Sequence, residues 1–393
     1  MKLLHLGDLH IGKTVNDFSM IQDQEYMFNQ ILKIAQERSV DGILIAGDVY
    51  DRTIPSEEAV RVFDDFLCRL SSLKIDAYVI SGNHDSDERL HFGSRLFEHS
   101  GIHIASKFQG EIYQHKVEDE FGKINIFLLP FVKASQVRHF FPDKEIENYD
   151  DAVRTVVESA SVNPAERNII VAHQFVVGRK ELPMIGGSEN ASVRRQVDGG
   201  DEQTVGTVEM VYSDCFNPFD YVALGHIHAP QCIGREEVRY SGSMLKYSKS
   251  EVLNEKSVPL ITLKEKGKVE IELIPLKPLR DMRHLKGTLE QLLNPEYIKD
   301  SEDYIFVTLT DENPVQDAML IFRQYYPNTM KIEYDNAHTR SMGEVEVSEA
   351  VMERPFQELA QDFYQMMYGV EISEAEMELL KKAAKEVGID EAD

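Results

Sequence analysis

The chain has 393 residues, 42% of them hydrophobic, which is enough for two or three domains with a sizeable core. Its formal net charge of −26 argues against a free-standing DNA-binding surface, because neutralising phosphates needs lysine and arginine. No window approaches the ~18 apolar residues of a membrane span, so we expect no membrane partner. The three cysteines form no zinc or disulfide pattern, which is typical of a cytoplasmic protein. The sequence starts directly with a predicted strand, so we expect no leader peptide.

Five short apolar runs are predicted to be buried strands, because they are rich in valine, isoleucine and leucine. Each run leads into a residue type that binds metal ions, and open α/β sheets place their chemistry at the carboxyl ends of strands. The strands are expected at 1–7, 42–47, 77–82, 168–172 and 221–225, and the candidate ligands at their ends are Asp8, His10, Asp48, Asn83, His173, His226 and His228.

The spacing of these residues favours a metal centre. Asp8 and His10, like His226 and His228, are two residues apart, so both side chains of each pair lie on one side of an extended segment. Glycines directly before several of these residues allow sharp turns and close approach to an ion. Seven oxygen and nitrogen donors are too many for one ion and suit two octahedral divalent cations that share a carboxylate, for which Asp48 has two oxygens.

Helices are predicted between the strands, near 21–38, 55–73 and 87–99, so residues 1–274 form an α/β domain. The second helix begins after Ser56 with two glutamates in its first turn, which is a helix-start signal. Its apolar residues recur at helical spacing, and we interpret them as core packing.

Two prolines in the segment that begins at Ile274 mark a linker, and a small α/β domain is predicted over 275–342. Its elements are expected to be a helix at 281–293, a strand from Tyr304, a helix at 314–325 and a strand from Met330.

Residues 343–393 are acidic, with 14 aspartates and glutamates against 4 lysines and arginines, and two helices are predicted there. Ser373 and Glu376 form a capping box for the second helix, whose apolar side includes Met377 and Leu380. An apolar stripe that its own short segment cannot cover needs a partner surface; the alternative is that both helices pack on this chain's own domains. The stripe of the first helix consists of Phe356, Leu359, Phe363 and Met366.

In their order along the chain, each after a strand, the candidate ligands resemble the pattern of the calcineurin-like metallophosphoesterase superfamily. The resemblance implies a β-sandwich flanked by helices and two-metal hydrolysis of phosphodiesters. Mixed imidazole, amide and carboxylate ligands suit Mn²⁺, while Mg²⁺, Fe²⁺ and Zn²⁺ stay open. By resemblance, the first site consists of Asp8, His10, Asp48 and His228, and the second of Asp48, Asn83, His173 and His226.

The same resemblance gives roles to residues beside the ligands. His84 follows Asn83 directly and is implied to be the general acid that protonates the leaving oxygen. Asp51 is implied to orient His84, with the capping of a turn as the alternative role, and Arg52 to contact the phosphate.

Longer segments resemble the SbcD family of nuclease subunits, and the resemblance covers essentially the whole chain. It implies a nuclease that degrades duplex DNA ends 3′ to 5′ and cuts single strands and hairpins, together with an SbcC-like ATPase, in DNA repair, recombination and replication. The segments that carry it are 47–55, 81–86, 221–228, 240–248 and 276–287.

The SbcD resemblance also implies partners. A homodimer would form through helices within 55–73 and 87–99, and the C-terminal helices would bind the ATPase. The ATPase would bring the ATP site and much of the basic DNA track, which reconciles a nuclease with the strongly negative charge. Arg194 and Arg195, in the polar segment 179–207, either contact the DNA backbone or belong to a solvated loop.

Two other functions fit parts of the pattern. A small-molecule metallophosphoesterase would use the same metals but has no need of the second domain or the acidic tail. A non-catalytic scaffold would keep the fold, but scaffolds of this kind lose ligands, and here all of them are present together with His84.

Overall fold

The computed structural model describes residues 1–179, 182–185, 194–198, 201–205, 209–295, 298–336, 361, 364, 372–373 and 376–381. The chain divides into two compact units. The larger unit comprises 1–286, 290–308 and 317–332, and the smaller comprises 287–289, 309–316 and the described residues from 333 onward.

The first of two six-stranded sheets is mainly parallel, with the order β18-β17-β1-β4-β5-β6. Its parallel strands are β1 (Lys2–Leu6), β4 (Gly42–Ala46), β5 (Asp76–Ile80) and β6 (Ile102–Ala105). Two antiparallel strands, β17 (Ser257–Leu263) and β18 (Val269–Pro275), complete the sheet beside β1.

The second sheet has the order β15-β16-β14-β9-β8-β7, again with parallel strands at its centre. The parallel strands are β8 (Gly122–Leu129), β9 (Arg167–His173), β14 (Tyr221–Gly225) and β16 (Arg235–Tyr240). The antiparallel edge strands are β7 (Tyr113–Asp119) and β15 (Gln231–Ile233).

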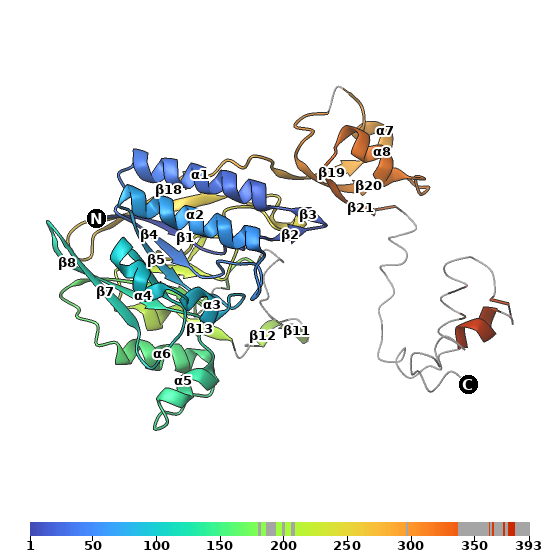
Figure 1. Ribbon diagram of the computed structural model, residues 1–393. Coiled ribbons are helices and arrows are strands. Elements are labelled where there is room, and N and C mark those ends of the chain that lie inside the picture. Colours follow the sequence, from blue (N-terminus) through green and yellow to red (C-terminus); the bar gives the residue numbers. More distant parts are fainter. Residues whose placement is uncertain are drawn as a thin grey trace. The chain divides into compact units, whose positions relative to one another are not determined.

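The two sheets pack face to face with helices outside each of them (Figure 1). A buried cluster that includes Leu3, Leu44, Ile126 and Val171 lies between the sheets. Separate clusters join the first sheet to α1 (Ile21–Glu37) and α2 (Glu57–Leu73), and the second sheet to α5 (Ala134–Phe140) and α6 (Tyr149–Ser159). The central strands are therefore buried on both faces, which explains their continuous apolar sequences. This architecture confirms the expected α/β fold with a β-sandwich flanked by helices.

The three predicted helices of the sandwich are present, one of them with a break, and α5 and α6 are further helices that were not predicted. Ser56 caps α2 by accepting a hydrogen bond from the Ala59 N–H, and the predicted apolar stripe packs in the core. The helix expected over 87–99 is interrupted at Phe92 and Gly93, where Gly93 has φ +78°. The helices are α1 (Ile21–Glu37), α2 (Glu57–Leu73), α3 (Asp87–His91), α4 (Ser94–Phe97), η1 (Glu98–Ser100), α5 (Ala134–Phe140) and α6 (Tyr149–Ser159).

Short elements occur in the connections between the main strands. They are the β2–β3 hairpin (Thr14–Val15 and Phe18–Ser19), the parallel pair β10 (Phe175–Val177) and β13 (Met210–Tyr212), the hairpin β11 (Arg194–Asp198) and β12 (Asp201–Val205), and the turns η2 (Ser213–Phe216) and η3 (Lys249–Glu251).

Beyond the sandwich, a three-stranded sheet has the order β19-β20-β21. The helix expected at 281–293 is wrong over most of its length, because β19 occupies residues 282–287 and only a short α7 follows. Sheet pairing overrides local helix propensity here. The other expected elements are present, and the bounds are β19 (Met282–Gly287), α7 (Leu289–Leu292), β20 (Tyr304–Leu309), α8 (Ala318–Tyr325) and β21 (Thr329–Tyr334).

The acidic C-terminal segment is described only at a few residues. Ser373 and Glu376 form the predicted capping box: the Ser373 N–H donates to Glu376 Oε2 at 3.1 Å, and the Glu376 N–H donates to Ser373 Oγ at 3.4 Å. The stripe predicted at Phe356–Met366 and the side chains of Arg194 and Arg195 lie outside what the structure describes. Among the described helices, none is both long and apolar enough to cross a membrane.

Candidate metal centre

The ends of five strands bring the seven candidate ligands together. Strands β1, β4 and β5 of the first sheet and β9 and β14 of the second run into them, and Gly225 pairs with His173 at the edge of the second sheet. Six of the seven are buried, although all seven are polar or ionisable; the exception, Asn83, is half-buried. Such groups are seldom buried without a partner, so their convergence indicates a binding site.

The Asp48 carboxylate lies at the centre of this group. Its Oδ2 is 3.6 Å from His10 Nε2, 3.5 Å from His173 Nε2 and 4.0 Å from His84 Nε2. Its Oδ1 accepts the backbone N–H of His84 at 2.9 Å. One oxygen is thus held by the backbone while the other faces three imidazoles, which is the position that a bridging ligand needs.

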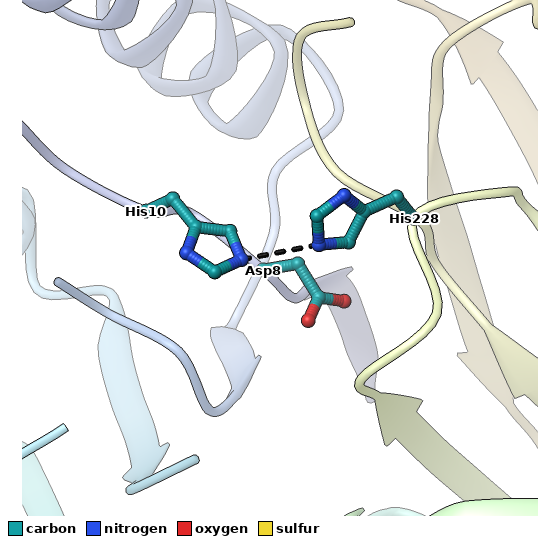
Figure 2. A group of neighbouring side chains, drawn as sticks. All are labelled: Asp8, His10 and His228. Carbon is teal, nitrogen blue, oxygen red and sulfur yellow. Dashed lines mark hydrogen bonds between the residues drawn. The ribbon is translucent and has the colours of Figure 1, made fainter. Parts of the chain in front are cut away.

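Asp8, His10 and His228 form one set of converging donors (Figure 2). His10 Nε2 and His228 Nε2 are 3.1 Å apart, and the Asp8 carboxylate lies beside the two rings. Asp8 also accepts the backbone N–H of His226 at 2.8 Å, which fixes its orientation. Two facing imidazole nitrogens can share only one hydrogen, so a lone pair on at least one of them is available to a metal ion. Together with the carboxylate beside them, these nitrogens suit a divalent cation.

Asn83, His173 and His226 form the other side of the centre. Asn83 Oδ1 is 3.0 Å from both His173 Nε2 and His226 Nδ1. The His173 Nδ1–H donates to the Ala46 carbonyl at 2.8 Å, so Nε2 carries the lone pair in the neutral ring. An amide oxygen and an imidazole lone pair that face each other lack a hydrogen between them, and a cation satisfies both.

Burial and mutual charge set the protonation of the donors. Burial lowers the pKa of His10 well below its usual value and that of His226 to about 3, so both rings are neutral at pH 7. Burial raises the pKa of Asp8 to about 6. Burial would also raise the pKa of Asp48, but the imidazoles of His173, His10 and His84 outweigh it and hold that pKa below its usual range. Neutral imidazoles and an ionised carboxylate are the forms that bind metal.

The backbone at the centre is held in unusual conformations. Asp8, His10, Asp48 and His226 have φ values of 52°, 44°, 48° and 98°, which cost of order 1–3 kcal/mol each for residues other than glycine. A Cβ atom on Gly82 would lie 2.1 Å from Asp48 Oδ1, so only glycine fits there. Gly82 therefore permits the close approach of the Asp48 carboxylate, and the backbone strain is typical of a functional site.

His84 is the most accessible histidine of the group, with 23% of its side chain exposed. Its Nδ1 lies 3.1 Å from the main-chain carbonyl oxygen of Asp51. The expected contact through the Asp51 carboxylate is corrected by this geometry: that carboxylate accepts a bond from Lys13 Nζ at 2.7 Å and lies 3.5 Å from His10 Nδ1. The Lys13 ammonium attracts the carboxylate, and the backbone of Asp51 is left to hold His84.

Arg52 was expected to contact the phosphate. Its side chain is 77% exposed, and its Nε lies 3.6 Å from Asp51 Oδ2. It is close in sequence to the centre but does not belong to the buried donor set, and its role stays a prediction.

Two further groups support the centre without having been predicted. The buried Asp85 carboxylate accepts three backbone N–H bonds, from Val49, Tyr50 and Gly82, at 2.9–3.0 Å, and so ties the loop after β4 to the loop after β5. The position of Asp85 directly after His84 in the sequence could have identified it. Glu251 and Lys256 lie behind His228, more than twenty residues further along the chain, and no sequence spacing marked them.

Comparison with known proteins agrees with this geometry. Sequence models of two families match the chain: calcineurin-like phosphoesterase at residues 1–230, and the type 5 capsule protein repressor C-terminal domain (SbcD_C) at residues 278–368. The chain is similar to the D component of the SbcCD nuclease of Staphylococcus epidermidis, with 32% identity over 97% of each chain. A dimetal phosphatase from Danio rerio aligns with 70% of this chain and 99% of its own, at 11% identity and a TM-score of 0.37.

The central position of Asp48 generates a prediction for metal binding. Asp48→Asn keeps the size of the side chain but removes the charge that faces three imidazoles, so total affinity for divalent cations should fall by at least ~10-fold. Isothermal titration of the metal-free chain with Mn²⁺ measures this. Asp65→Asn, on the exposed side of α2, is the matched control and should bind as the unchanged chain does. Unaltered binding by Asp48→Asn would show that Asp48 is not a ligand.

Proposed function

Because the chain belongs to the calcineurin-like phosphoesterases and, within them, to the SbcD family of nuclease subunits, we propose that it is a metal-dependent DNA nuclease. The observation that carries the proposal is the convergence of seven donors, six of them buried and Asp48 at their centre, in a chain that matches a nuclease component along 97% of its length. Hydrolysis of a phosphodiester needs charge stabilisation at the phosphate and a proton for the leaving oxygen, and the centre has residues for both.

The donor set supports two ions, with Mn²⁺ the best match and Mg²⁺ as an alternative. Asp8, His10 and His228 would hold one ion, Asn83, His173 and His226 the other, and Asp48 both. When bound, such ions lower the pKa of water and offset the charge of the phosphate. The chain's own contribution is a rigid, largely buried set of ligands, among which the His10 and His226 imidazoles are neutral at pH 7.

His84 is the residue that the geometry favours as the general acid. Its Nδ1 is held by the Asp51 carbonyl, so Nε2 is directed toward Asp48 Oδ2, 4.0 Å away. It is also partly exposed, unlike the buried ligands, and can reach a substrate. In its protonated form it delivers a proton from Nε2 to the leaving oxygen.

We further propose the activities of the family: 3′ to 5′ attack on duplex ends and cleavage of single strands and hairpins. The proposed domains are the nuclease domain at 1–274, a capping domain at 275–342 and an ATPase-binding segment at 343–393. The family match that begins at 278 supports the first boundary. An SbcC-like ATPase partner supplies positive charge for DNA, since this chain has a net charge of −26.

A homodimer is the second proposed assembly. Phe92 and Leu96, on or beside the short helices α3 and α4, are 83% and 75% exposed, and Phe97 beside them is 37% exposed. Large apolar side chains that gather on one segment are typical of an interface. These residues lie in the segment 87–99 that the family resemblance assigns to dimer formation.

The alternative activity is hydrolysis of a small phosphodiester. A labelled DNA hairpin and bis-p-nitrophenyl phosphate, each tested with Mn²⁺ and with chelator, distinguish the two. Metal-dependent cleavage of the hairpin supports the nuclease, and turnover of the small ester alone would assign the chain to the small-molecule enzymes.

The role of His84 is tested by His84→Gln. Loss of the positioned acid should lower the rate of hairpin cleavage by ~10²-fold or more, while Mn²⁺ affinity changes little. Asp51→Asn is the informative companion: it keeps the carbonyl that holds His84 and should therefore have a much smaller effect on the rate. A large loss of bound metal in His84→Gln would instead make His84 a ligand.

The dimer is tested by replacing both exposed apolar residues, Phe92→Ser together with Leu96→Ser. Analytical ultracentrifugation should show a shift from dimer to monomer, because the interface loses two large apolar contacts. Leu253→Ser, at a residue that is 92% exposed in another region, is the matched control and should remain dimeric. A variant that is still fully dimeric would place the interface elsewhere.

The C-terminal segment is tested by truncation after Gly343. The shortened chain should keep metal-dependent cleavage of single strands but lose stable association with the ATPase and ATP-dependent attack on duplex ends. Salt should weaken association of the full chain, because the segment is acidic. Undiminished co-purification of the truncated chain with the ATPase would rule out this segment, and a large fall in its own melting temperature would show that the helices pack on this chain instead.

A further inference from the structure

We propose that residues 241–256 form an outer support for one of the two metal sites, in which Glu251 positions the ligand His228. The inference rests on the proposed two-metal centre and assigns a role to the 240–248 segment, which the proposed chemistry leaves without one. It predicts that the two ions depend on different parts of the chain.

Glu251 is fully buried and lies directly behind His228. Its Oε1 is 3.6 Å from His228 Nδ1, on the opposite side of the ring from Nε2, which faces His10 Nε2 at 3.1 Å (Figure 2). A carboxylate at Nδ1 favours the hydrogen on that nitrogen and leaves the lone pair of Nε2 directed into the centre. Partners of this kind orient histidine ligands and raise their basicity.

Lys256 holds Glu251 in this position. Its buried ammonium donates to Glu251 Oε2 at 2.7 Å, to Ser243 Oγ at 2.8 Å and to the main-chain oxygen of His228 at 2.9 Å. An ammonium has three hydrogens, and here each has an acceptor. Because Lys256 contacts both Glu251 and the backbone of His228, it fixes the distance between the carboxylate and the ring.

A buried ion pair is a poor way to stabilise a fold, because the cost of desolvation offsets most of the attraction. Apolar residues of similar size would fill the space behind His228 at no such cost. The pair therefore indicates a requirement on the position and tautomer of His228 rather than on folding alone.

The backbone of residues 242 and 243 lies in close contact with the main-chain carbonyl of His228. The Ser243 N–H donates to the His228 carbonyl at 3.1 Å. Gly242 has φ +73°, and a Cβ atom on it would lie 2.6 Å from the same oxygen. The carbonyl of His228 is thus bound by both the backbone and the lysine of one segment, which immobilises the ligand at its main chain as well as at its ring.

Tyr247 extends the support to His10. Its ring packs edge-on against the rings of His10 and His228, with centroids 5.8 Å and 6.0 Å apart. Its hydroxyl donates to the Leu9 carbonyl at 2.8 Å and accepts a bond from Gln24 Nε2 at 3.0 Å. Both histidines of the first set are therefore backed by residues 241–256, whereas His173 of the second set is held by Ala46.

The test is a titration of the full-length, metal-free chain with Mn²⁺, followed by electron paramagnetic resonance of the loaded protein. The unchanged chain should bind two ions and give the signal of a coupled pair. Glu251→Gln removes the charge at His228 Nδ1, so one of the two affinities should fall by about 10–100-fold while the other stays within about twofold. At limiting Mn²⁺ the coupled signal should give way to that of a single ion.

Two further variants separate positioning from folding. Glu265→Gln makes the same chemical change in the exposed turn between β17 and β18 and should leave both affinities unchanged. Glu251→Gln combined with Lys256→Met removes both buried charges, so no unpaired ion destabilises the chain. It should keep a metal-free melting temperature near that of the unchanged chain and still lose the same ion.

Each result has a distinct meaning. Two ions bound with unchanged affinity by both Glu251 variants would overturn the inference and leave the proposed function intact. Equal loss of both ions would also overturn it, because the support would not be specific to one site. Failure of both variants to fold without metal would make the network a requirement of folding, which again overturns the positioning role. If the unchanged chain bound no ions, the proposed function itself would fail.

Discussion

The Asp48 carboxylate is the point on which the architecture of this protein depends. One of its oxygens is bound by the backbone of His84 and the other faces His10 and His173 from opposite sheets. A charge with so little solvent exposure is stable only if its surroundings compensate it. The histidines at the ends of strands from both sheets provide part of that compensation. Several of the surrounding atoms are hydrogen-bond acceptors with no hydrogen between them, and a divalent cation would satisfy these.

The sandwich makes this arrangement rigid. Parallel strands deliver their carboxyl ends to one edge, and their faces are buried between the sheets and the helices, so the loops that hold the ligands begin from fixed positions. Asp8, Asp48 and His226 keep left-handed backbone conformations that would relax in a free loop. Asp85 joins two of these loops through three N–H groups, and residues of the 241–256 segment lie behind the candidate ligand His228. The strain is thus balanced by hydrogen bonds behind the ligands.

The distribution of charge separates chemistry from recognition. The metal centre concentrates donors for cations, and the chain as a whole is acidic, so the affinity for a polyanion has to come from bound metal and from a partner. Phe92 and Leu96 are exposed apolar residues in a different part of the sandwich, where we propose that the dimer forms. Under the proposed function, the chain contributes the site of cleavage and the proposed ATPase partner contributes the affinity for DNA.

The sequence by itself determined the five strands that lead into candidate ligands, the order of those ligands and the helix that begins after Ser56. Each of these depends on a local pattern: an apolar run, a glycine before a polar residue, or a capping side chain. The prediction from sequence was wrong where pairing at long range decides, as at 282–287, which form a strand beside β20. The sequence also predicted that the Asp51 carboxylate contacts His84, whereas the contact is made by the Asp51 main-chain carbonyl. The carboxylate is instead paired with Lys13, which lies far away in the sequence. Only the tertiary structure placed Glu251 and Lys256 behind His228, since an ion pair folded against a ligand leaves no periodicity or spacing in the sequence.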